Sequence, residues 1–183
     1  MTSSSASHIP TALREVLGNG SLAGHWTLDP AQSTVSLRSK HAWGLAAVKG
    51  AFRSFEGDGT VSPTGEVTGR LVIAAGSVDT NSKARDAHLR DQFFLSEKYP
   101  SIAFALDKFV QRDELVTVHG VLTVQETSLP ISFPAKAALT GDSEAVLEAT
   151  VQVDRSDYGI TVNKIGMVSM KATISVRLVF TKD

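Results

Sequence analysis

The densest cluster of side chains that could do chemistry is the segment 85–91, Arg-Asp-Ala-His-Leu-Arg-Asp. Arginine in such a cluster suits an anionic head group, because its planar guanidinium can bond two phosphate oxygens at once. The alternative is a solvated helix surface whose Asp–Arg pairs each contribute roughly a few tenths of a kcal/mol. Phe93 and Phe94 follow directly. Two adjacent phenylalanines indicate that the segment packs against an apolar surface, as a lid would.

Metal binding has little support in the histidine pattern. No two histidines have the i, i+4 or His-x-His spacing of a preformed site. Asp86 and His88 would hold a metal only if another strand supplied a third ligand. The alternative for His88 is packing or hydrogen bonding where the helix meets the rest of the fold. The five histidines are His8, His25, His41, His88 and His119.

Patterns of catalysis and nucleotide binding are also missing from the sequence. There is no Gly-x-Ser-x-Gly nucleophile motif. The sequence Gly57-Asp58-Gly59 does not open a helix, so it indicates a turn, and Asp113-Glu114 indicates a solvated turn. The chain has no cysteine, which excludes disulfides, thiolate catalysis and cysteine-ligated metals. We therefore predict no catalytic residue, no metal and no cofactor.

Length and charge are those of an ordinary globular domain. The 183 residues carry a formal net charge of −1, and lysine and arginine are scattered, so we expect no nucleic-acid partner. No run approaches the roughly 18 uninterrupted apolar residues of a membrane-spanning helix. Residues 1–7 lack the basic and apolar regions of a signal peptide. We expect a cytoplasmic protein with no integral membrane segment.

A short amphipathic helix is expected near the N-terminus. Pro10 opens a stretch in which Leu13, Val16 and Leu17 have the i, i+3, i+4 spacing of one helix face. Gly18 marks its end. We assign residues 1–24 to an N-terminal extension that contains this helix of about two turns.

From Trp26 onward the apolar period becomes two, which is typical of strands with one wet and one buried face. Turn sequences separate the strands, as in a meander closed into a barrel or sandwich. Residues 83–94 interrupt the alternation and predict a short helix, with Asn81 or Ser82 as N-cap. Alternating runs include 35–37, 71–73, 102–106, 131–133, 145–153 and 170–180.

The two faces of these strands bear on function. Strands that are apolar on one face and charged on the other suit a barrel with an apolar interior in water. A porin-like barrel has the opposite arrangement. Alternation alone does not say which face points inward, but the composition and the charged turns favour an apolar interior.

A set of motifs follows in a fixed order along the chain, at 26–35, 40–41, 48–52, 55–57, 77–80, 85–90, 93–94, 97–100, 120–124 and 154–159. In their order and spacing, these motifs of residues 26–180 resemble the YceI-like family of lipocalin-like polyisoprenoid-binding proteins. The resemblance implies that residues 25–183 form an eight-stranded antiparallel barrel with a helix beside it and an apolar pore that holds an isoprenoid chain. Many family members carry a signal peptide. Because we expect none in this sequence, their periplasmic location does not carry over.

The chain departs from the family pattern at three loops. Residues 90–99 are one residue shorter than usual, and residues 163–168 form a shorter loop than in some members. At 125–130 the usual glycine before the proline is missing, which we expect to alter the turn because glycine supplies positive φ.

We expect the domain to bind a long-chain polyisoprenoid of the quinone or prenyl phosphate type, for carriage, storage or sequestration. Head-group candidates are Lys40, Arg85 and His88. A one-residue error in register would exchange the inward and outward rows. The residues expected to line the pore are Leu37, Phe52, Leu71, Ile73, Phe93, Phe94, Phe104, Ile174 and Val176.

Two other functions stay open at this point. A lipid-acting isomerase or hydrolase on the same barrel would need a buried His or carboxylate near the pocket. Only His41 and His88 are at positions that suit this role. A barrel filled by its own side chains would serve protein interaction, with the N-terminal helix as a docking arm. The sequence does not fix the oligomeric state, and a homodimer is one arrangement it leaves open.

Overall fold

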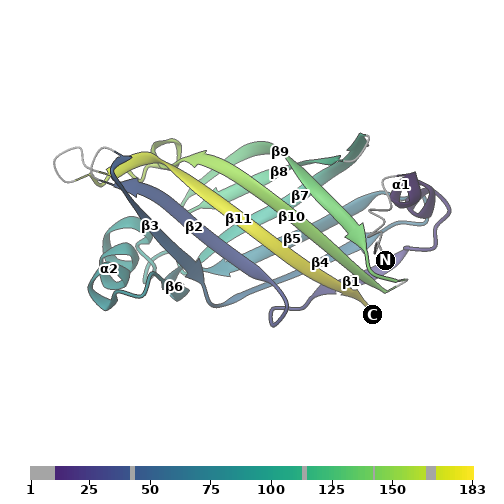
Figure 1. The fold of residues 1–183 in the computed structure, drawn as a ribbon, viewed down its shortest axis with the longest axis horizontal. Helices are drawn as coiled ribbons and strands as arrows, with labels where there is room; N and C mark the ends of the chain where they lie inside the picture. Colours follow the sequence, from purple (N-terminus) through teal and green to yellow (C-terminus); the bar gives the residue numbers. More distant parts are fainter. Residues whose placement is uncertain (1–10, 42–43, 113–114, 142, 164–167) are drawn as a thin grey trace, which may run out of the picture.

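The computed structural model describes residues 11–41, 44–112, 115–141, 143–163 and 168–183, and it is built almost wholly of antiparallel strands (Figure 1). The helical elements are α1 (Thr11–Gly18), η2 (Ala75–Ser77), α2 (Lys83–His88), η3 (Leu89–Phe94) and η4 (Arg155–Tyr158). The strands are β1 (Gly24–Leu28), β2 (Thr34–His41), β3 (Ala46–Phe52), β4 (Phe55–Val61), β5 (Val67–Ala74), β6 (Val78–Asp79), β7 (Ser101–Arg112), β8 (Leu115–Val124), β9 (Thr127–Leu139), β10 (Glu144–Asp154) and β11 (Val168–Lys182).

The strands close into an eight-stranded up-and-down barrel, as predicted. β1 and β2 occupy one strand position of the barrel. β1 pairs with β4, and β2 pairs with β3, which precedes β4 in the chain. In the same way β3 and β4 form one strand, and β6 extends the position of β5 by pairing with β3. The predicted turn at Gly57-Asp58-Gly59 is wrong, because these residues lie within β4 and pair with β5. Asp113 and Glu114 lie outside the described residues. Each remaining strand pairs with its neighbour in sequence. β11 closes the ring, since it pairs with β10 on one edge and with β1 and β2 on the other.

Alternation places the apolar rows inside the barrel. The sequence pattern does not reveal one shift in register, which lies on β7. On β7 the inward positions are Ile102, Phe104 and Leu106, followed by Phe109. The register with β8 shifts between Leu106 and Lys108. A bulge there inserts one residue, so the inward row continues on odd-numbered positions.

The predicted N-terminal helix is present as α1, which ends at Gly18; Pro10 lies outside the described residues. α1 lies at one end of the barrel and α2 at the other (Figure 1). Leu13 and Leu22 are buried against a cluster that includes Trp26. The indole N–H of Trp26 donates to the carbonyl of Leu22 at 3.0 Å, which holds the segment after α1 against the barrel.

The predicted helix at 83–94 is also present, with α2 followed by the π-helical turn η3. Ser82 is the N-cap residue, as predicted, but its side chain makes no capping hydrogen bond. The helix start is anchored by Asp86 instead. Its carboxylate accepts from the backbone N–H of Thr80 at 2.9 Å and from the Thr80 hydroxyl at 2.6 Å.

In the β8–β9 turn, which lacks the usual glycine, Gln125 adopts a positive φ of 56°. A side chain in this region is unfavourable unless neighbouring structure holds it. Here the Gln125 side-chain amide donates to the carbonyl of Phe93 at 2.8 Å. The turn is therefore tied to η3 across the end of the barrel.

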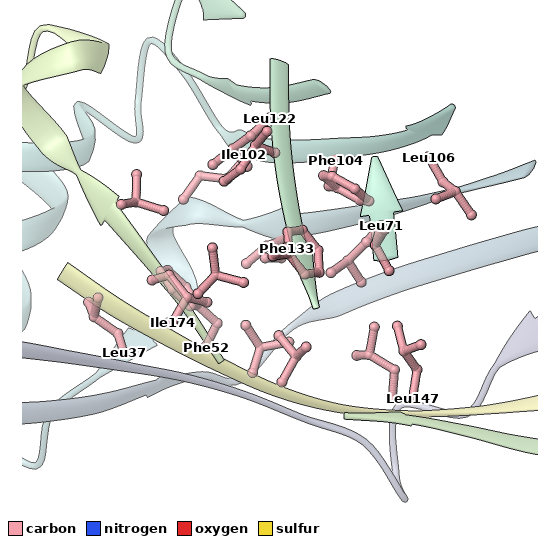
Figure 2. A pocket seen from close by; sticks show the side chains of 18 of the residues that line it. Leu37, Phe52, Leu71, Ile102, Phe104, Leu106, Leu122, Phe133, Leu147 and Ile174 are labelled. Atoms are coloured by element: carbon pink, nitrogen blue, oxygen red, sulfur yellow. The ribbon is translucent and has the colours of Figure 1, made fainter. Parts of the chain in front are cut away.

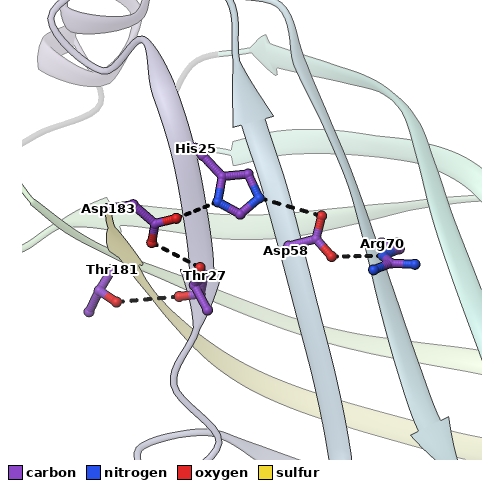
Figure 3. A network of polar contacts seen from close by, with 6 residues as sticks. All are labelled: His25, Thr27, Asp58, Arg70, Thr181 and Asp183. Carbon is purple, nitrogen blue, oxygen red and sulfur yellow. Dashed lines mark hydrogen bonds and ion pairs between the residues drawn. The ribbon is translucent and has the colours of Figure 1, made fainter.

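An exposed polar network lies where β1 meets β4 and the end of β11 (Figure 3). His25 Nδ1 lies 2.5 Å from Asp183 Oδ2, and His25 Nε2 lies 3.8 Å from Asp58 Oδ2. The Thr27 hydroxyl donates to Asp183 at 2.9 Å, and Arg70 Nε donates to Asp58 at 2.7 Å. The hydrogen bond to Asp183 raises the pKa of His25, and the charges of both carboxylates act in the same direction.

This network predicts a pH-dependent contribution to stability. Because the folded pKa of His25 is raised, its stabilisation is complete below the ordinary value of about 6.5 and is lost as pH rises through the folded pKa. The pKa of Asp183 is lowered by the same pair, so the contribution also falls at low pH, as that carboxylate protonates. Urea unfolding of His25→Gln should show a larger loss of stability at about pH 6 than at about pH 8.

The matched control is His119→Gln, whose ring Nδ1 lies 2.7 Å from the Ser132 hydroxyl. Its loss of stability, measured at the same two pH values, separates the effect of removing a strand histidine from the effect of removing the Asp183 pair. An equal loss for His25→Gln at both pH values would contradict the role of the ion pair.

Candidate functional site

An elongated cavity of about 870 Å³ occupies the barrel interior. Its wall includes Leu13 and Leu17 from α1, and Arg85 and His88 from α2, so it reaches both ends of the barrel. This volume lies in the upper part of the range of small-molecule pockets, roughly 300–1,000 Å³. A barrel filled by its own side chains would lack such a space.

The nine residues predicted to line the pore all border this cavity. Figure 2 shows Leu37, Phe52 and Ile174 on one side of the space, with Phe104 across from them. Phe93 and Phe94 reach it from η3 and pack against the main core cluster, as the predicted lid would. Their contact with a ligand stays a prediction.

The inward side chains are less buried than core side chains normally are. Phe104, Ile174 and Val176 are only half-buried, although they point into the barrel. Val35, which also points inward, is 1% exposed. The difference arises because the half-buried side chains face open space that water can enter. Removing each Å² of this apolar surface from water would stabilise the protein by about 25 cal/mol, so the cavity favours an apolar ligand.

Aromatic rings gather at the end of the cavity beside α2. The Phe52 and Phe94 rings meet edge to face with centroids 5.7 Å apart, and the His88 and Phe93 rings do so at 5.5 Å. The guanidinium carbon of Arg155 lies 5.1 Å from the Phe93 centroid, within the range of a cation–π contact. These contacts fix η3 across this end of the barrel.

Arg155 is a buried cation on the cavity wall that sequence reasoning did not select as a site residue. Its Nε donates to the carbonyl of Ser169 at 3.0 Å, and one terminal nitrogen donates to the carbonyl of Ile160 at 2.7 Å. Burial lowers its pKa, although the charge of Asp154 acts in the opposite direction. The signal was present in the family-like segment 154–159, which carries this arginine.

The three head-group candidates also border the cavity at the α2 end. Arg85 is held by Thr80: its Nε donates to the hydroxyl at 2.8 Å, and a terminal nitrogen donates to the carbonyl at 3.2 Å. Lys40 is exposed at the rim. Alternation along β2 places Ser39 and His41, rather than Lys40, in the inward row with Leu37.

Ser39 was missed by the sequence reasoning, yet it carries a polar atom inside the barrel. Its hydroxyl is buried and has no hydrogen-bond partner within the described ranges. A buried hydroxyl without a partner costs free energy, and a polar ligand atom beside it would remove that cost. It lies on the same wall as His41 and near the rim where Lys40 emerges.

Metal ligands do not gather anywhere in the part of the chain that the structure describes: no three histidine, aspartate or glutamate side chains come together there. Within the same residues, every helix is too short or too polar to cross a lipid bilayer.

The fold and the cavity define a class: an up-and-down eight-stranded barrel with a long apolar interior, as in lipocalin-like binding proteins. The YceI-like domain matches residues 26–180, so the chain belongs to the YceI-like family. A UPF0312 protein of Yersinia enterocolitica is 30% identical over 135 residues, which cover 69% of this chain and 70% of that protein. Membership of this family supports a binding role in general.

Solved structures that share the fold include the following two. BcnA of Burkholderia cenocepacia has a TM-score of 0.76 at 21% identity, covering 83% of this chain and 98% of BcnA. A polyisoprenoid-binding domain of Saccharophagus degradans has a TM-score of 0.72 at 18% identity, covering 86% of this chain and 98% of that domain. At these identities the likeness establishes the architecture.

The cavity shape depends on Gly120, an inward position on β8. A Cβ added there would meet the carbonyl of Ala105 and come within 2.5 Å of the Phe104 ring. That ring in turn packs 5.7 Å from the Phe133 ring, centroid to centroid. Gly120→Ala should therefore displace Phe104 and lower the free energy of unfolding by about 1–3 kcal/mol, measured by urea unfolding.

Gly76→Ala is the matched control, because its added Cβ would meet the Ser96 side chain at an ordinary contact distance of 3.5 Å. If both substitutions lower stability equally, the packing of Phe104 over Gly120 is not the cause.

Proposed function

We propose that the barrel binds one molecule of a long polyisoprenoid-type lipid, with the apolar chain along the interior. The observation that supports this most directly is the partly exposed inward row, which includes Phe104, Ile174 and Val176. Covering this surface with an apolar chain removes it from water. Carriage, storage and sequestration all require this binding step.

An elongated ligand fits better than a compact one. β11 has 15 residues, and an extended strand of that length measures about 50 Å. A tilt of about 40° shortens this to roughly 38 Å along the barrel axis. A narrow interior of this length, bordered by side chains from both ends, suits a linear chain.

The charges of the wall favour an anionic head group at the α2 end. Lys40, Arg85 and Arg155 border the cavity there. Asp58 is the one acid among the described residues of the wall, and it is already paired with Arg70. A prenyl phosphate satisfies this arrangement better than an uncharged quinone, because phosphate oxygens accept charge-assisted hydrogen bonds.

The comparison with the Saccharophagus degradans domain supports the same class of ligand through its fold, since that protein is described as polyisoprenoid-binding. The ring cluster of Phe52, Phe93 and Phe94 supports it independently. It supplies a broad apolar surface beside the cationic rim, where the first isoprene units next to the head group would lie.

A polar substitution inside the barrel should weaken binding of a prenyl alcohol. Ile174→Gln places an amide on the cavity wall, where it cannot be hydrated once an apolar chain is bound. We expect the dissociation constant for geranylgeraniol, measured by native mass spectrometry, to rise about tenfold or more. Thr173→Gln, on the adjacent outward position, should bind as the parent protein does. Equal binding by both variants would contradict an interior site.

The head-group assignment predicts a charge-dependent effect. Arg85→Ala should weaken binding of geranylgeranyl phosphate about tenfold, which corresponds to roughly 1.4 kcal/mol, and should leave geranylgeraniol binding almost unchanged. Lys83→Ala is the matched control, since Lys83 is exposed on the same helix and lies off the cavity wall. A parallel loss for alcohol and phosphate would show that Arg85 acts only through the fold.

A further inference from the structure

The helix α1 lies outside the family-matched residues 26–180, yet it forms part of the cavity wall. Leu13 and Leu17 of α1 border the cavity, as does Leu22 just after the helix. We propose that Leu13 and Leu17 form the floor of the cavity and set the longest lipid chain that the barrel accepts. This inference rests on the proposed function and adds a determinant of ligand length to it.

The floor is held against the barrel by packing and by hydrogen bonds. Leu13 is 8% exposed and Leu22 is 4% exposed, so both are packed against the barrel. The Trp26 indole bonds the Leu22 carbonyl, and the Ser21 hydroxyl donates to the carbonyl of Val16. The Lys182 ammonium donates to the carbonyl of Ser21 at 3.0 Å, which joins the segment to the end of β11.

The β4–β5 turn is shaped to receive the helix. Gly65 lies in this turn with a φ of 86°, a conformation that favours glycine. A Cβ at Gly65 would lie 2.7 Å from the carbonyl oxygen of Leu17. The absence of a side chain therefore lets the turn touch the helix backbone, and this contact sets the depth at which Leu17 sits.

The floor and the cationic rim are at opposite ends of the barrel (Figure 1). A lipid whose head group lies near Arg85 and Arg155 directs the free end of its chain toward Leu13 and Leu17. The distance between the two ends is then fixed by the strands. A chain longer than this distance would have to displace α1 or leave its head group unbound.

The other face of α1 provides a control. Arg14 and Glu15 are exposed and do not border the cavity. Substitutions at these positions change the same helix without changing the floor.

The test is a competition between chain lengths. The full chain is incubated with an equimolar series of all-trans prenyl alcohols from farnesol upward, and the bound lengths are read by native mass spectrometry. Leu13→Ala with Leu17→Ala deepens the cavity, so the preferred length should increase by about one isoprene unit. Leu17→Phe raises the floor and should shift the preference to shorter chains. Arg14→Ala with Glu15→Ala should leave the distribution unchanged.

The outcomes separate this inference from the proposed function. If the parent protein takes up no prenyl alcohol, the proposed function fails. If it takes them up, but the double alanine variant and Leu17→Phe keep the parental length distribution, only the floor assignment is overturned. Should the double variant lose its cooperative thermal transition, Leu17→Phe alone decides.

Discussion

Closure of the barrel by β11 is the constraint on which the other features depend. One edge of this strand pairs with β10 along its length, and the other edge pairs with β2 and then with β1. A sheet closed in this way has no free edge, and one of its faces becomes an interior. The alternating apolar rows then face one another across a space that they do not fill.

The same inward-facing rows of side chains form both the packed core and the wall of the cavity. Where inward side chains meet closely, as around Val35 and Leu28, they are almost fully buried and act as core. Where they face open space, as at Ile174, they retain apolar surface that packing alone would have covered. The two ends also differ: α1 supplies leucines, whereas α2 and η4 bring Arg85 and Arg155. The interior therefore has a direction, apolar at one end and cationic at the other.

Much of this arrangement could be predicted from the residues. Period-two alternation predicts the strands and the rows of β10 and β11, since side chains on a strand alternate between faces. The adjacent pair Phe93 and Phe94 predicts the packed helix, and Gly18 predicts the end of α1. The number of strands came from the family resemblance, because alternation does not distinguish a barrel from a sandwich.

Other features depend on tertiary contacts that leave no local pattern. The bulge after Leu106 moves the inward row to Phe109, and only the pairing with β8 reveals it. Lys40 is a head-group candidate from the sequence, whereas alternation from Leu37 places Ser39 in the inward row. The conformation of Gln125 is stabilised by a bond to Phe93, 32 residues away in sequence.

The most direct test of the central claim is a crystal structure of the full chain purified without added lipid and then soaked with geranylgeranyl phosphate. We expect continuous elongated density along the barrel axis, with the phosphate near Arg85 and Arg155 and the chain end toward Leu17. An interior that contains only ordered water after soaking, with the lipid elsewhere or absent, would contradict the account.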